Sequence, residues 1–130
     1  MISNVLERMT DIDYLIKFAD KWSKLASLQK SVIDYLRTNS QYYGSYSDFM
    51  RTVGFKATNV NMNIQLINWL NDKNIIAIEK FDINKVPSEY RQFIKVKSKI
   101  KTFRLENNWL DNLYNTDDFS YDDIKIKKGE

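Results

Sequence analysis

Apolar side chains recur along the chain with the period of a helix over most of its first half. They return every three or four positions over residues 3–22 and again over residues 26–38, as on one buried helix face. Two further helices are expected at residues 46–53 and 59–73. The first of the four either packs on the domain or pairs two subunits, and the spacing leaves both options open.

Polar and glycine positions mark where the two later helices begin and end. Ser45 and Asp48 have capping-box spacing ahead of the third helix, and Gly54 stands where a left-handed residue commonly ends one. Thr58 or Asn59 can cap the fourth helix. Two helices joined by such a short turn make a helix-turn-helix candidate.

The pattern changes to that of strands after residue 74. Residues 75–82 are predicted to form one strand, and residues 93–105 a second. Between them, a loop is expected because this stretch contains Pro87, the only proline. A short helix is predicted at residues 107–115, after a connector at residues 41–45 that has room only for a very short strand.

Lysines and apolar residues alternate in the second predicted strand. One face carries apolar or small side chains and the other a lysine ladder, which consists of Lys95, Lys97, Lys99 and Lys101. After Thr102 the apolar positions shift to Phe103 and Leu105, which predicts a bulge, bend or turn near residues 99–102.

Positive charge is concentrated in the same region. The whole chain has a formal net charge of +3, yet residues 80–104 hold eight basic side chains against Asp82 and Glu89. A local basic cluster of this kind is expected of a surface that binds phosphates. The alternative is a solvated strand face.

Residues 106–123 carry only acidic charges, and we expect a disordered tail at residues 116–130.

The missing residue types argue against catalysis. The chain has no histidine and no cysteine, so it lacks the commonest general base and the thiolate and imidazole metal ligands. Asp11 with Asp13, and the acidic pairs of the tail, are suited only to weak binding of a hard cation. We therefore expect no enzyme, no cofactor and no metal site.

The order of the predicted elements resembles the winged-helix superfamily of DNA-binding domains. Residues 28–36 are similar to the opening helix of that family, residues 66–76 to the end of its recognition helix, and residues 102–110 to its second wing strand and last helix. The resemblance implies an α+β fold, mostly helical with a small antiparallel wing. The expected domain spans residues 25–115, with residues 1–24 as an N-terminal helical extension.

The resemblance also implies which residues meet DNA. In this family the recognition helix enters the major groove and the wing contacts the backbone. Placed on a helix, Asn61, Gln65 and Asn68 share a polar face that suits adenine. That helix has no basic residue before Lys73 and has apolar side chains beside its polar face, so the wing is the stronger candidate. The candidate nucleic-acid-binding residues are Lys56, Thr58, Asn59, Asn61, Gln65, Asn68, Lys80, Lys85, Arg91, Lys95, Lys97, Lys99 and Lys101.

These features predict a duplex-DNA-binding transcription regulator, and two alternatives stay open. Basic strands interleaved with aromatic rings also suit a single-stranded-DNA-binding accessory protein of replication. A winged-helix protein-interaction module is the third option, since the acidic, aromatic stretch at residues 117–123 is able to fold back on the wing or to dock a partner. A homodimer through the N-terminal helix is compatible with each.

No apolar run approaches the roughly 18 residues of a membrane span and no secretory signal is visible, so we expect a cytoplasmic protein.

Overall fold

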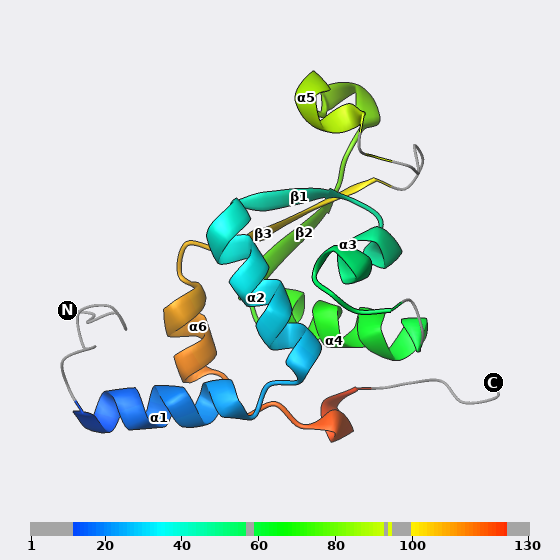
Figure 1. Ribbon diagram of the computed structural model, residues 1–130. Coiled ribbons are helices and arrows are strands. Elements are labelled where there is room, and N and C mark those ends of the chain that lie inside the picture. The colour runs from blue at the N-terminus through cyan, green and yellow to red at the C-terminus, as the bar shows by residue number, and fades with distance from the viewer. Residues whose placement is uncertain (1–11, 57–58, 93, 95–99, 125–130) are drawn as a thin grey trace.

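The fold is α+β, as the sequence predicts. The computed structural model describes residues 12–56, 59–92, 94 and 100–124, and within them it holds six α-helices and a three-stranded antiparallel sheet (Figure 1). The helices are α1 (Ile12–Ser23), α2 (Ser27–Asn39), α3 (Tyr46–Thr52), α4 (Val60–Asp72), α5 (Ser88–Arg91) and α6 (Trp109–Asn115). The strands are β1 (Gln41–Gly44), β2 (Ile76–Lys80) and β3 (Lys101–Leu105).

The last strand lies at the centre of the sheet. The strand order is β1-β3-β2, so β3 pairs with both other strands. One of them, β1, precedes β3 by some sixty residues. Phe103 of β3 stands between Tyr42 and Ile78 in the register. The short strand that the connector had room for is therefore β1, at the edge of the sheet.

The main core lies on the side of the sheet that α2, α3 and α4 cover, below the strands in Figure 1. The rings of Phe49 and Phe103 are both fully buried and stack with centroids 4.4 Å apart. Gln29 is the one fully buried amide of this core among the described residues. Its Oε1 accepts from the backbone N–H of Ala26, and its Nε2 donates to the carbonyl of Leu66. A buried polar side chain with both ends satisfied joins α2 to α4 and fixes how they pack.

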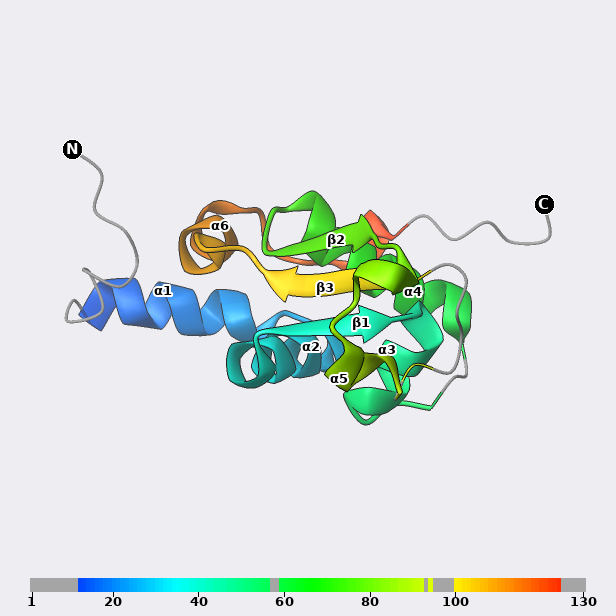
Figure 2. The same ribbon diagram turned by 90° about the horizontal axis from the view of Figure 1, so that it is seen from above.

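The opposite face of the sheet is covered by the described residues of the connection between β2 and β3, namely 81–92, 94 and 100. Its described part holds a 3₁₀ turn, η1 (Ile83–Lys85), and the helix α5, so the expected loop is wrong in this detail. Asp82 caps the turn and Pro87 precedes the helix, which explains the local structure. Val86, Ile94 and Ile100 form a second small core there. Figure 2 shows this connection crossing β1, with α5 beside that strand at the edge of the sheet.

Because the sheet is covered on both sides, its central strand is buried on both faces. Thr102 and Phe103 are both buried although they point in opposite directions. This explains the change of apolar face that the sequence shows at this point. The pairing runs without interruption from Lys101 to Leu105 with β2 and from Lys101 to Arg104 with β1, and Ile94 and Ile100 lie outside the strand. The second strand is therefore shorter than predicted.

The N-terminal helix packs beside the C-terminal one. Tyr14 of α1 is buried and stacks on Tyr114 of α6, with ring centroids 3.9 Å apart. Phe18 and Trp22 of α1 pack against the main core. The first turns of α1 extend past α6, away from the body of the molecule (Figures 1 and 2). The part of the predicted helix before residue 12 lies outside the described residues.

The acidic segment after α6 is structured, against expectation, as far as Ile124. It contains a 3₁₀ turn, η2 (Tyr121–Asp123), and the side chain of Phe119 is only 6% exposed. Phe119 packs edge-on against Trp69 of α4 with centroids 5.2 Å apart. A single aromatic anchor thus holds a segment whose composition predicts disorder. Residues 125–130 lie outside the described residues.

Candidate nucleic-acid interface

Two lysines face each other at one end of the sheet. Lys80 ends β2 and Lys101 begins β3, and the register places them directly opposite, with Gly44 of β1 as the third member of the row. By strand alternation their side chains lie on the same side of the sheet as Phe103, the helical side. Within the part of the chain that the structure describes, neither lysine forms a salt bridge. We call Lys80 and Lys101 the lysine pair.

Like charges directly across a sheet destabilise it, so the lysine pair needs an explanation. The nearby Arg104 lies on the other side of β3 and is paired with Glu79 at 3.5 Å and Glu106 at 3.1 Å. Arg104 therefore has two carboxylate partners. Among the described residues, no carboxylate forms a salt bridge with the lysine pair.

A chain of contacts connects the lysine pair to α4. The ammonium of Lys101 lies 5.3 Å from the ring centroid of Tyr46 in α3, a cation–π contact. The hydroxyl of Tyr46 donates to Oδ1 of Asn68 at 2.6 Å. Burial raises the pKa of Tyr46 above its ordinary value, so its hydroxyl stays protonated at neutral pH and keeps this bond. The predicted site residues Lys101 and Asn68 are thus brought together through a tyrosine.

The other predicted residues of α4 divide by exposure. Asn59 and Asn61 are exposed, whereas Gln65 and Asn68 are half-buried. Asn59 occupies the position before the helix in a left-handed conformation (φ 52°), and its side chain makes no capping hydrogen bond. Asn61 is therefore the residue of this face that is most available to a partner, and Asn68 is already engaged by Tyr46.

The remaining predicted basic residues lie apart from the lysine pair or outside the described part. Lys56 is exposed in the turn that leads from α3 towards α4. Lys85 and Arg91 are exposed on the β2–β3 connection, where the Nε of Arg91 donates to the carbonyl of Val86 at 2.8 Å. Four predicted residues lie outside the described residues, namely Thr58, Lys95, Lys97 and Lys99.

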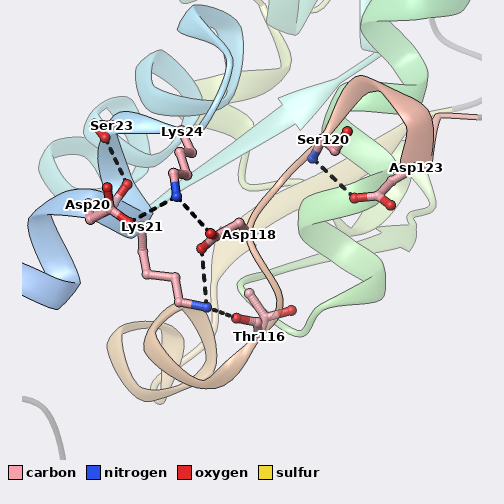
Figure 3. Close-up of polar contacts among 8 residues, drawn as sticks. All are labelled: Asp20, Lys21, Ser23, Lys24, Thr116, Asp118, Ser120 and Asp123. Atoms are coloured by element: carbon pink, nitrogen blue, oxygen red, sulfur yellow. Dashed lines mark hydrogen bonds and ion pairs between the residues drawn. The ribbon is translucent and has the colours of Figure 1, made fainter.

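The C-terminal segment reaches α1 and α4 rather than the basic face of the sheet. Asp118 pairs with Lys24 at 2.8 Å and with Lys21 at 3.4 Å, and Lys21 also donates to the carbonyl of Thr116 (Figure 3). The hydrogen bond from Lys24 holds the pKa of Asp118 below its ordinary value, and the same contact raises that of Lys24. We call these contacts, together with Phe119, the clasp.

The clasp buries an apolar residue of α4 that the sequence pattern places beside the exposed polar face of the helix. Trp69 stands beside the polar face of the helix, yet it is only 5% exposed because Phe119 covers it. The signal in the sequence was weak: two aromatics, Phe119 and Tyr121, inside an acidic stretch. The sequence left contact with the wing open as one option, but the described lysines that Asp118 meets are Lys21 of α1 and Lys24, which directly follows that helix.

Sequence reasoning also missed a cleft lined by tyrosines. Its volume is about 310 Å³, and it opens between the end of α2, the strand β1 and the helix α5. The lining residues are Tyr35, Asn39, Gln41, Tyr42, Tyr43, Tyr90 and Ile94. We call it the tyrosine cleft. No repeated spacing in the sequence connects α2, β1 and α5, so only the folded chain brings these residues together.

Comparisons of the whole chain with models of protein families, with curated proteins and with solved structures find no match. Among the described residues, no three acidic side chains gather in a group able to hold a metal ion. No helix in the described ranges has the length and apolar character needed to cross a membrane.

Proposed function

We propose that the protein is a small winged-helix regulator of transcription that binds duplex DNA. The order of elements from α2 to α6 supports this, since it contains the helix pair α3–α4 followed by the two strands β2 and β3 and a closing helix. In this proposal α4 is the recognition helix and the β2–β3 connection is the wing. Because the fold alone does not define an activity, the proposal depends on the charged site.

The observation that carries the proposal is the lysine pair. Two cations directly opposite each other reduce the stability of the sheet unless an anion lies between or above them. A DNA backbone presents phosphates in a regular row, and lysine binds them as a compact point charge. Lys101 is also half-buried against Tyr46, which positions its ammonium beside α4.

In the proposed complex, the two elements have different tasks. The lysine pair, Lys85 and Arg91 contact phosphates and fix the orientation of the protein on the duplex. Asn61 and Gln65 of α4 face base edges, where amides pair with adenine. Since α4 carries no cation before its C-terminal end, most of the affinity should come from the phosphate contacts and should fall steeply with salt.

The test removes the lysine pair without changing its size greatly. We expect the double variant Lys80→Gln, Lys101→Gln to bind a duplex oligonucleotide more weakly, with a salt slope lower by roughly one unit for each lost phosphate contact. Fluorescence anisotropy at about 50 and 200 mM salt measures both quantities. In contrast, the free variant should be slightly more stable to heat, because the repulsion between the two lysines is gone.

A charge-matched control separates this site from general positive charge. The variant Lys17→Gln, Lys30→Gln removes two cations from α1 and α2, and we expect it to bind DNA as the unmodified protein does. Equal losses in both variants, or none in either, would contradict the site. Preference for a single strand of the same sequence supports the replication-type alternative instead, and binding to neither supports a protein-interaction module.

A further inference from the structure

The tyrosine cleft has a composition that suits one class of ligand. Four of its seven lining residues are tyrosines, two are primary amides and none carries a charge. Its volume of about 310 Å³ lies at the small end of the range for small-molecule sites, which is roughly 300–1,000 Å³. A charged group would lose hydration there without a counter-ion, so the lining favours an uncharged ring with a polar edge.

Part of the cleft lining is exposed to solvent and therefore accessible to a ligand. Tyr90 of α5 is 50% exposed, and its ring centroid lies 5.6 Å from that of Tyr43, at an interplanar angle of 39°. The two rings are splayed rather than stacked, and half of Tyr90 stays open to solvent. Asn39 and Gln41 are exposed beside them.

The amides keep unused hydrogen-bonding groups. Nδ2 of Asn39 donates to the backbone carbonyl of Tyr35 at 3.0 Å, and Nε2 of Gln41 donates to the hydroxyl of Tyr43 at 2.8 Å. These bonds orient both side chains and leave the two amide oxygens and the second hydrogen of each NH₂ group to a ligand. Burial raises the pKa values of Tyr35 and Tyr42, so both hydroxyls remain neutral donors.

We propose that the tyrosine cleft binds one nucleobase, stacked on Tyr90 or Tyr43 and hydrogen-bonded along its edge by Asn39 and Gln41. Aromatic faces and primary amides are the groups that recognise a base outside a duplex. The base is supplied either by an unpaired nucleotide of a nucleic acid or by a free nucleoside. The first source rests on the function proposed above, whereas the second does not.

The experiment uses 2-aminopurine, a base whose fluorescence is quenched by stacking. Three probes are titrated with the full chain: a single-stranded oligonucleotide with one central 2-aminopurine, the same strand in a matched duplex, and the free 2-aminopurine riboside. We expect quenching of the single strand or of the riboside, and much less of the duplex. The Tyr90→Ala variant should bind the quenched probe about 5- to 150-fold more weakly, as expected for the loss of one stacked base.

A second exposed tyrosine provides the control. Tyr121 of η2 is 59% exposed and does not line the cleft, so Tyr121→Ala should leave quenching unchanged. Quenching that Tyr90→Ala and Gln41→Ala do not weaken overturns the cleft site. So does the absence of quenching with every probe. If salt-dependent duplex binding through the lysine pair persists in that case, only the cleft proposal has failed.

Discussion

Two pairs of neighbouring lysines in the described part of the chain differ in how their charge is balanced. Lys21 of α1 and Lys24, just after that helix, share the carboxylate of Asp118, which follows more than ninety positions later. Lys80 and Lys101 face each other in the sheet, and no described carboxylate pairs with them. In the function proposed above, the first pair therefore serves the fold, whereas the second binds phosphates of the DNA. Each of the following changes tests one side of this contrast.

The largest expected effect comes from the aromatic anchor of the clasp. Replacing Phe119 with Ala empties its place against Trp69 and should lower the free energy of unfolding by about 3 kcal/mol, at the lower end for a buried phenylalanine. Urea unfolding followed by tryptophan fluorescence measures this loss. Phe119→Leu, which keeps an apolar side chain, should retain most of the stability. A loss below about 0.5 kcal/mol in Phe119→Ala would mean that the segment does not stabilise the domain.

The next largest effect is expected when one lysine of the lysine pair is replaced by a carboxylate that pairs with the other. In Lys80→Glu the new carboxylate faces Lys101 across the strands, as Asp118 faces Lys21 and Lys24. Affinity for a duplex should fall at least about tenfold at 0.1 M salt, because one phosphate contact is lost and a second cation is neutralised. Thermal stability should rise by about 0.2–1 kcal/mol. Fluorescence anisotropy measures the loss of affinity, and calorimetry measures the gain in stability. A Lys80→Glu variant that binds the duplex as tightly as the unmodified protein would refute the comparison.

A smaller effect should follow from removing the charge of the clasp while keeping its anchor. Asp118→Asn loses both ion pairs, but the carboxylate is 44% exposed and solvent screens it. We expect a slight fall in melting temperature at low salt that disappears at about 1 M salt. DNA binding should stay the same, since the clasp lies away from the lysine pair. Tighter binding in Asp118→Asn would instead indicate that the segment competes with DNA.

The smallest effect is a dependence on pH. The pKa of Asp118 is lowered from 3.8, so its contribution to stability is complete above that value and is lost as the pH falls through the folded-state pKa. The pKa of Lys24 is raised from 10.5, so its contribution is complete below that value and is lost at higher pH. Between the two values the clasp stays charged. A weak acid transition in Trp69 fluorescence should be present in the unmodified chain and absent in Asp118→Asn.

The sequence predicted the parts of the fold that local periodicity controls. The helices α2, α3 and α4 begin and end within one or two residues of their expected positions, and Gly54 has the positive φ (98°) expected at a helix end. Each has an apolar face of its own that repeats every three or four residues. Local spacing is sufficient there, because one buried face defines each helix.

Other parts depend on contacts between distant segments, and these escaped prediction. The helix α5 packs through Tyr90 on Tyr43, 47 positions earlier in the chain, so nothing local to Pro87 predicts it. Phe119 is a single aromatic without a repeat, yet it decides the path of the last segment. For the candidate site, the basic content of residues 80–104 was visible in the sequence. That Lys80 and Lys101 are direct cross-strand neighbours required the register of the sheet.

The clasp has a consequence for how the protein is made. Lys24 and Asp118 are 94 positions apart, so this ion pair closes the domain across nearly its whole described length. A ribosome delivers the chain from the N-terminus, and contacts between remote positions form last. While the segment that holds Phe119 is still inside the exit tunnel, Trp69 is left without its cover. The unfinished domain therefore presents an apolar surface until this segment emerges, which makes this stage the one at which aggregation or chaperone binding is most expected.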